Sequence, residues 1–75
     1  MKSNIAYIDV DNKRNGPVVY MVAYKSGTTR FYTDNNLPKT AADYINGCTS
    51  MRRVKYPAVD RDGNFYELVY IRVIA

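Results

Sequence analysis

The segment 51-MRRVKYPAVDRDGNFYELVYIRVI-74 decides the fold, because two apolar-rich runs flank the turn sequence DRDGN. Its Asp62-Gly63 pair is the strongest turn signal in the chain, since such pairs favour the backbone conformation of tight hairpins. β-Branched and aromatic residues recur on both sides, as is typical of strands. Pro57 interrupts the first run and indicates an edge strand or a bulge. The segment therefore predicts a long β-hairpin of residues 51–60 and 65–74.

Three shorter strand-like runs precede this hairpin. Residues 5–11 alternate apolar and polar side chains, residues 17–25 are apolar on both faces, and residues 28–33 follow a tight Ser-Gly turn. Alternation of this kind indicates a strand with one buried face. A strand that is apolar on both faces indicates a central position in a sheet. A turn is expected over residues 12–16, between the first two runs.

A single short helix is predicted over residues 37–46. The apolar residues that recur at helical spacing along one face are Leu37, Ala41, Ile45 and Cys48. Two N-terminal caps are possible, one at Asn36 and one at Thr40 with Asp43. Gly47 is expected to end the helix in a left-handed conformation.

The element order β-β-β-α-β-β predicts one α+β domain over residues 1–75. An antiparallel, five-stranded sheet would form one layer, and the short helix would cover one of its faces. Two-residue loops at both tight turns would pair Tyr56 with Val69 and Val22 with Phe31, all in the core beneath the helix. The opposite, open face would then display a set of aromatic and basic residues: Tyr7, Arg30, Tyr32, Arg53, Lys55, Tyr66, Tyr70 and Arg72.

This open face is the candidate binding site of the sequence. Tyr and Arg are enriched at protein–protein interfaces, which favours docking onto another protein. Self-association is one alternative, and binding of RNA or single-stranded DNA by Tyr stacking and Arg/Lys contacts is another. Because one short helix cannot cover both sheet faces, we expect a small, non-enzymatic protein that acts by protein–protein interaction. Its size suits a phage or mobile-element accessory factor, or an inhibitor of a host protein.

Composition excludes several classes of site. The 75-residue chain has one Cys and no His, so it lacks imidazole bases, Cys/His zinc sites and internal disulfides. Its Gly residues are isolated, so no phosphate-binding loop and no cofactor are expected. The net charge of +4 suits nucleic acid, an acidic protein or plain solubility. No apolar run approaches the ~20 residues of a membrane helix, and a lone thiol suits a reducing compartment, so a cytoplasmic location is expected.

Three weaker chemical candidates have simpler structural explanations. Asp9 and Asp11 could form an acid–base pair, but solvated edge charges are expected instead. Asp60 begins a D-x-D-G pattern similar to a calcium loop, but the twelfth position counted from it is Ile71 rather than an acid. Cys48 is expected to be a small buried hydrophobe. Neither a catalytic residue nor a metal site is expected.

Overall fold

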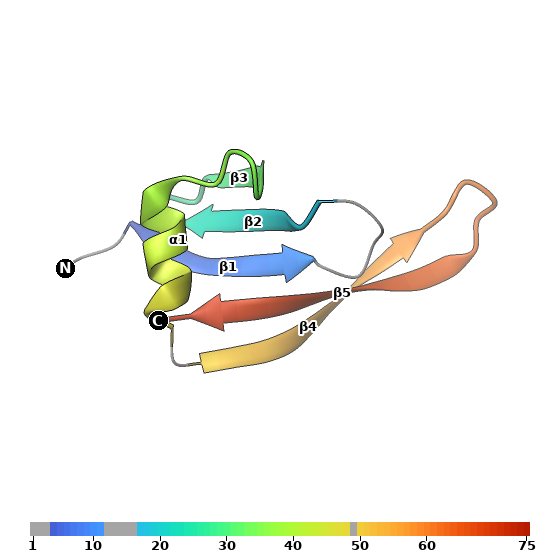
Figure 1. Ribbon diagram of the computed structural model, residues 1–75. Coiled ribbons are helices and arrows are strands. Elements are labelled where there is room, and N and C mark those ends of the chain that lie inside the picture. Colours follow the sequence, from blue (N-terminus) through green and yellow to red (C-terminus); the bar gives the residue numbers. More distant parts are fainter. Residues whose placement is uncertain (1–3, 12–16, 49) are drawn as a thin grey trace.

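The computed structural model describes residues 4–11, 17–48 and 50–75, which form five strands and one helix (Figure 1). In chain order the elements are β1 (Ile5–Asp11), β2 (Val19–Tyr24), β3 (Thr29–Thr33), α1 (Lys39–Asn46), β4 (Ser50–Val59) and β5 (Phe65–Ile74). The strands form one antiparallel sheet in the order β3-β2-β1-β5-β4. The predicted α+β class and element order are confirmed. The turn predicted over residues 12–16 lies outside the described residues.

Helix α1 begins at Lys39, two residues later than predicted, and neither predicted side-chain cap forms. Pro38 occupies the N-cap position, while the Asn36 amide oxygen accepts a hydrogen bond from the N–H of Thr33 at 2.7 Å. Asn36 therefore stabilises the preceding turn and not the helix. Gly47 ends the helix with φ −93°, so the expected left-handed conformation is wrong. Among the described residues, no helix is long and apolar enough to cross a membrane.

The hydrophobic core lies where α1 packs across one end of the sheet (Figure 1). Its buried members are Ile5, Ile8, Val22, Ala41, Tyr44 and Val73. Leu37, Ile45 and Cys48 pack against this cluster, which confirms the predicted apolar face of the helix. Tyr44 was not part of that prediction. Its hydroxyl donates to the Ala6 carbonyl at 2.9 Å and accepts from the Ala75 N–H at 3.0 Å, which ties α1 to β1 and to the end of the chain.

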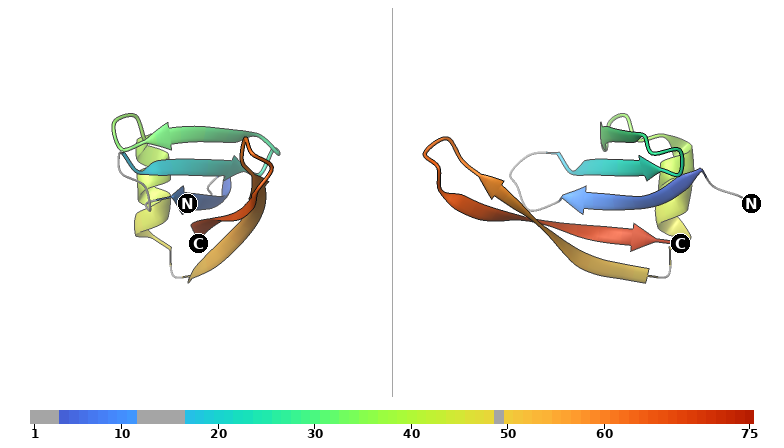
Figure 2. Two further views of the ribbon diagram at one scale, coloured as in Figure 1. Left: turned by 90° about the vertical axis from the view of Figure 1, so that its right-hand side faces the viewer. Right: turned by 180° about the vertical axis from the view of Figure 1, so that it is seen from behind.

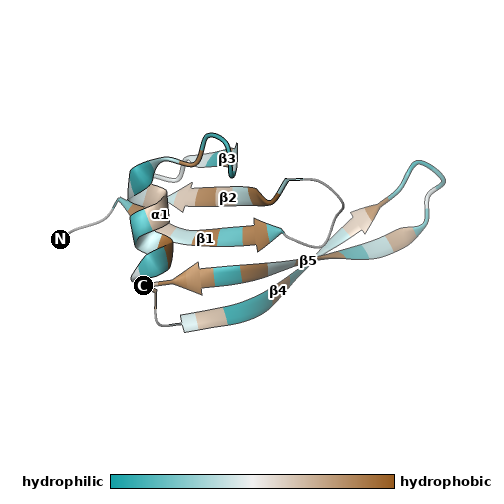
Figure 3. Ribbon diagram, in the orientation of Figure 1, coloured by the Kyte–Doolittle hydropathy of each residue, from teal (hydrophilic) through white to brown (hydrophobic). Residues whose placement is uncertain are grey.

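The β4–β5 hairpin extends well beyond the other strands and gives the molecule extents of 46 × 22 × 22 Å. β5 pairs with β1 at residues 71–73, whereas its pairing with β4 continues out to Phe65. We call residues 57–67 the arm and the rest of the described chain the body. The right view of Figure 2 shows that the arm projects past the ends of β1 and β2. Figure 3 shows hydrophobic segments in the part of β5 that lies in the body and in the part that lies in the arm, with hydrophilic bands between them.

The β4–β5 register differs from the prediction by one residue. Val59 pairs with Phe65 and the N–H of Asp60 donates to the carbonyl of Asn64 at 3.0 Å, so the loop holds residues 61–63 and is one residue longer than the two expected. The Asp60 carboxylate accepts the N–H groups of Asp62 and Asn64, both at 2.9 Å, and stabilises this wider turn. A slip of one residue exchanges the faces of the two strands relative to each other. The predicted face assignments of β4 are therefore wrong.

The β2–β3 register also differs from the prediction by one residue. Tyr20 pairs with Tyr32 and Met21 with Phe31, and the N–H of Tyr24 bonds the carbonyl of Thr28 at 2.8 Å. The loop thus holds three residues, and its Gly27 has φ 96°, a conformation that suits glycine. The slip places Tyr32 and Arg30 on the helix side of the sheet and Phe31 on the opposite side. The predicted positions of these three side chains are wrong.

Candidate interaction site

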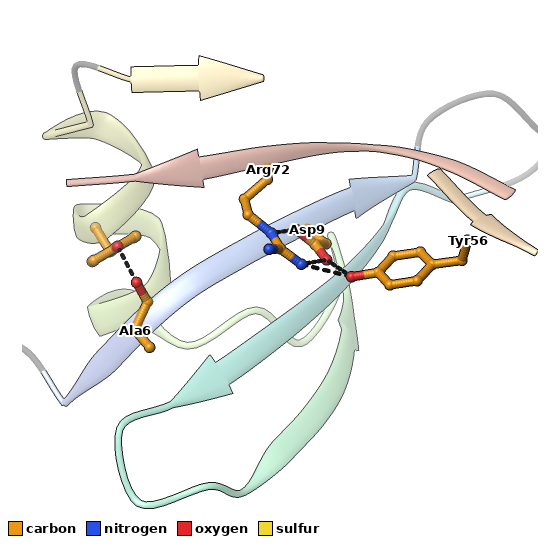
Figure 4. Close-up of polar contacts among 5 residues, drawn as sticks. Ala6, Asp9, Tyr56 and Arg72 are labelled. Atoms are coloured by element: carbon orange, nitrogen blue, oxygen red, sulfur yellow. Dashed lines mark hydrogen bonds and ion pairs between the residues drawn. The ribbon is translucent and has the colours of Figure 1, made fainter. Parts of the chain in front are cut away.

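A buried carboxylate lies at the centre of the helix-free face of the sheet. Asp9 follows the core residue Ile8 in β1, so its side chain points away from α1, and yet it is 0% exposed. Arg72 binds both carboxylate oxygens, with Nε to Oδ1 at 2.8 Å and Nη2 to Oδ2 at 3.1 Å (Figure 4). The Tyr56 hydroxyl donates to Oδ2 at 2.8 Å and accepts from Arg72 Nη2 at 2.6 Å. At this position the face is thus covered by the side chains of Arg72 and Tyr56.

Three strands bring these groups together. Asp9 and Arg72 are direct partners in the β1–β5 ladder, whereas Tyr56 comes from β4, on the far side of β5. The Tyr56 ring extends back toward β1 and reaches the carboxylate (Figure 4). Among the described residues, no buried side-chain nitrogen or oxygen lacks a hydrogen-bond partner. The buried charge of Asp9 is therefore compensated, as burial of an ion requires.

Two further tyrosines complete the arrangement. The Arg72 guanidinium lies over the Tyr7 ring, 3.8 Å from its centroid, which adds a cation–π contact. The rings of Tyr56 and Tyr70 meet edge to face with centroids 5.5 Å apart, a favourable geometry for aromatic pairs. We call Tyr7, Asp9, Tyr56, Tyr70 and Arg72 the Asp9–Arg72 cluster. It joins β4 to the body at the base of the arm.

The electrostatics of the cluster keep its donors protonated. Burial, followed by the hydrogen bond to Asp9, raises the pKa of Tyr56 above its ordinary value. The hydrogen bond to Asp9 raises the pKa of Arg72, although burial opposes that shift. Arg72 therefore keeps its positive charge, and the Asp9 carboxylate forms an ion pair with it at 2.8 Å. A cation held in this way is not available to neutralise a phosphate.

The structure distributes the predicted site residues over several places. Tyr7, Tyr70 and Arg72 belong to the Asp9–Arg72 cluster, and Tyr66 lies in the arm. Those on other surfaces are Arg30 and Tyr32 on the helix side of β3, and Arg53 and Lys55 on the helix side of β4. The predicted single Tyr/Arg/Lys face is thus not present, because both hairpin registers slip by one residue.

Tyr56 is the member of the Asp9–Arg72 cluster whose face the sequence predicts wrongly, because the predicted register puts it in the core beneath the helix. Its partners Asp9 and Arg72 stand 47 and 16 residues away along the chain. Arg72 was predicted on the helix-free face, whereas Asp9 was expected as a solvated edge charge and is instead 0% exposed. Their pairing depends on the antiparallel contact of β1 with β5, which local sequence patterns do not reveal. The alternation around Asp9 was the available signal, because an acid between two apolar core positions faces away from the helix.

The arm carries exposed hydrophobic side chains that pack against nothing in the core. Phe65 is 83% exposed, Val59 53% and Tyr66 44%. Val59 and Phe65 are direct partners at the last pair of the hairpin, and Tyr66 follows on the other face. Single exposed apolar residues, such as Phe31 in β3, are ordinary on protein surfaces. The exposed Val59–Phe65 pair forms a small apolar surface on one face of the projecting hairpin, and Tyr66 adds an exposed ring on the other face. Exposed apolar surface of this kind marks interaction sites.

The weaker chemical candidates are occupied by structural contacts. Asp60 stabilises the turn of the arm, and the Asp9 carboxylate is bound by Arg72 and Tyr56. The Cys48 Sγ donates to the Tyr44 carbonyl at 3.0 Å, and burial raises the pKa of this thiol. No group of three or more candidate metal ligands occurs among the described residues. The arm is therefore the candidate site whose hydrophobic side chains remain exposed to solvent.

Similarity to other proteins adds nothing to this geometric evidence. Comparisons of the chain with protein-family models, with curated proteins and with solved structures find no significant match.

Proposed function

We propose that this protein acts by binding another protein, and that the arm makes the central contact. The observation that carries the proposal is the exposed Val59–Phe65 pair on one face at the end of the projecting hairpin, with Phe65 83% exposed. Full burial of one such side chain stabilises a complex by about 1.5–3 kcal/mol. Aromatic anchors of this type dominate the energetics of protein interfaces. A small binding domain of this kind suits an accessory factor or an inhibitor of a larger protein.

The base of the arm supports this proposal through preorganisation. The arm is continuous with the β4–β5 ladder, and Tyr56 at its base is bonded to Asp9 and Arg72 in the body. A binding element whose geometry is set before contact loses less conformational entropy on association. The arm can therefore present Phe65 in one orientation to a partner.

Binding of RNA or single-stranded DNA through the sheet face receives less support. Arg72 is paired with Asp9, and the Tyr7 ring is covered by that guanidinium. Arg53 and Lys55 lie on the other face of the sheet from Tyr70. Stacking of bases needs accessible rings close to accessible cations. Arg52 is exposed on the helix-free face, but the exposed ring of Tyr66 on that face lies at the far end of the hairpin from it.

The test compares Phe65→Ser with the matched control Phe31→Ser, because Phe31 is also an exposed aromatic residue (65%) but lies in β3 of the body. Each protein is immobilised, and proteins retained from a lysate of the source organism are identified by mass spectrometry. We expect the wild type and Phe31→Ser to retain the same partner and Phe65→Ser to lose it. Equal retention by all three would contradict a role for the arm.

Two measurements separate the rival functions. Light scattering of the purified protein gives its mass, and a concentration-dependent dimer that Phe65→Ser abolishes would assign the arm to self-association. Absorbance at 260 nm and oligonucleotide affinity at low and high salt detect nucleic acid, whose binding falls steeply with salt. Tight, salt-dependent oligonucleotide binding that Phe65→Ser leaves unchanged would replace the proposal.

A further inference from the structure

β4 forms an open edge of the sheet along its full length. It is the last strand in the order β3-β2-β1-β5-β4, and its 10 residues pair with β5 on one side. Figures 1 and 2 show no other described helix or strand along its outer side. An edge strand presents unpaired N–H and C=O groups to which a further strand can bond.

The hydrogen-bond pattern identifies which groups of β4 face this edge. The N–H of Asp60 donates to the carbonyl of Asn64 at 3.0 Å, so this pair is of the hydrogen-bonded type. Hydrogen-bonded and non-hydrogen-bonded pairs alternate along an antiparallel ladder. The odd-numbered residues of β4, among them Arg53 and Lys55, therefore direct their backbone groups outward. Pro57 is also odd-numbered, so its missing N–H leaves the ladder with β5 complete, and the predicted edge position is correct.

The open edge is strongly basic. β4 contains Arg52, Arg53 and Lys55 and no acidic residue. All three side chains are exposed, and the described residues provide no ion pair to any of them. Their partners in β5 are Arg72, Ile71 and Val69, respectively, none of which is acidic. The positive charge of this strand is therefore not neutralised by its neighbour.

We infer that the β4 edge binds an acidic, extended segment of the partner protein, which adds to the sheet as a further antiparallel strand. Main-chain hydrogen bonds supply affinity in strand addition, and alternate side chains supply specificity. A second copy of this chain is the poorer occupant, because two-fold pairing of β4 with itself places Arg and Lys of one copy against those of the other. An acidic segment instead matches every unpaired cation of the strand.

The positions of the cations define the segment. Arg53 and Lys55 project on the helix side of the sheet, two residues apart, and Arg52 projects on the opposite side. An antiparallel partner strand would place acids opposite Lys55 and Arg53, two residues apart, and a third directly after them, opposite Arg52. A hydrophobic residue four positions before the first acid would lie opposite Val59, against the exposed surface of the arm.

Nucleic acid also carries negative charge, but it needs accessible aromatic rings close to the cations for base stacking, and this edge does not provide them. The exposed rings of Phe65 and Tyr66 lie at the far end of the hairpin from Arg53. Arg53 and Val59, the partner of Phe65, are six positions apart, which corresponds to about 20 Å along a strand. Phosphate contacts at the cations would therefore leave those rings out of stacking range of the same nucleotides.

This inference deepens the proposed function, because it names the chemistry of the segment that the partner would contribute beside the arm. The probe is a fluorescein-labelled peptide of sequence TFTVTEVEET, which has the phenylalanine and the three glutamates at the required spacing. Its control is the same peptide with glutamine in place of each glutamate. Fluorescence anisotropy at low salt measures both affinities, and we expect the acidic peptide to bind at least about tenfold more tightly.

The matched protein variants are Arg53→Glu/Lys55→Glu in β4 and Lys25→Glu/Arg30→Glu at the opposite edge, where both cations are also exposed. The two double variants change the net charge equally, so general electrostatic attraction is held constant between them. We expect the β4 variant to lose at least about tenfold in affinity, and the control to change by less than about threefold. Far-UV circular dichroism checks that both variants are folded.

Backbone methylation of the peptide tests strand addition itself. N-methylation of the second valine and the last glutamate alters N–H groups that face away from β4, so binding should persist. N-methylation of the first two glutamates removes N–H groups that face β4, so binding should be lost. Equal effects of the two methylated peptides would overturn strand addition.

The remaining outcomes also decide the question. Equal binding of the glutamine peptide, or equal losses in both double variants, would overturn the inference. Tighter binding of a labelled oligothymidylate that the β4 variant abolishes would assign the edge to nucleic acid instead. If Phe65→Ser loses its captured partner while the acidic peptide does not bind, the proposed function stands and this inference alone fails.

Discussion

The body and the arm are built from the same kind of sequence but are stabilised in different ways. The body buries Ile8 and Val22 completely beneath α1, whereas the arm leaves Val59 and Phe65 more than half exposed. A two-stranded hairpin by itself is marginally stable in water. The arm therefore depends on the Asp9–Arg72 cluster at its base, and its apolar side chains are free for another role. Stability and binding are assigned to separate regions of one short chain.

The largest effect should come from removing the buried carboxylate that links the two regions. Asp9→Ala leaves the Arg72 guanidinium, with a side chain 16% exposed, next to an empty site. Breaking a buried ion pair from one side costs about 3–5 kcal/mol, a large share of the roughly 5–15 kcal/mol of a whole domain. Urea denaturation followed by circular dichroism measures the loss.

The control for this experiment is Asp43→Ala, because the Asp43–Lys39 ion pair in α1 is exposed (51% and 89%). Exposed pairs contribute about 0–1 kcal/mol, so this variant should remain close to the wild type. A loss below about 1 kcal/mol for Asp9→Ala would show that the cluster does not stabilise the junction of body and arm.

The hydrophobic contrast gives the second effect. Ile8→Ala creates a cavity in the fully buried core and should lower the free energy of unfolding by about 2–4 kcal/mol. Val59→Ala removes a comparable aliphatic side chain that is 53% exposed in the arm. This variant should change the free energy of unfolding by less than about 0.5 kcal/mol. Similar losses in both variants, measured by urea denaturation, would mean that the arm packs as tightly as the body.

The third effect isolates a single hydroxyl. Tyr56→Phe removes the hydrogen bonds to Asp9 and Arg72 but keeps the ring, so we expect a loss of about 1–2 kcal/mol. Tyr70→Phe keeps its edge-to-face contact with Tyr56 and should be nearly neutral. Amide hydrogen exchange should show that Tyr56→Phe increases opening in the arm more than in β1 and β2. Uniform acceleration across the sheet would contradict a local role.

The smallest effect is a dependence of stability on alkaline pH. The pKa of Tyr56 is raised in the folded protein by burial and by Asp9, and the pKa of Tyr20 is raised by its hydrogen bond to Asp34. The folded state thus holds these protons more tightly than the unfolded state, whose tyrosines titrate near pH 10. The free energy of unfolding should be constant below that pH and fall as pH rises above it.

Urea titrations at pH values on both sides of the ordinary tyrosine pKa measure this decline. Each of the variants Tyr56→Phe and Tyr20→Phe should make the decline of the free energy of unfolding with pH shallower, because each removes one tyrosine with a raised pKa. Stability that increases through this range would contradict the raised pKa of both tyrosines.

Local sequence patterns were sufficient for the elements and for the core of the body. Alternation placed Ile8 on the core side of β1, and helical spacing placed Ala41 on the buried face of α1. Both patterns depend on residues a few positions apart, whose relation is set by the geometry of the strand or helix itself. The α+β class and the bounds of β1 and β5 followed from the same signals, whereas β2 (Val19–Tyr24) is shorter than the predicted run 17–25.

The composition of the candidate site could not be predicted in the same way. The Asp-Gly pair was interpreted as a two-residue loop, but the Asp60 side chain accepts two backbone N–H groups and favours a wider turn. One extra residue in each hairpin register moved Arg53, Lys55 and Tyr32 to the helix side. The same shift brought Tyr56 out of the predicted core and onto Asp9.

The sequence alone determined the order of elements, the apolar face of the helix and the basic character of β4, since each depends on neighbouring residues. Tertiary structure decided which side chains share a face and which cation is neutralised. The contact between Asp9 and Arg72 joins residues 63 positions apart. It exists because β1 and β5 pair in one register, and a shift of a single residue would place Arg72 on the other side of the sheet.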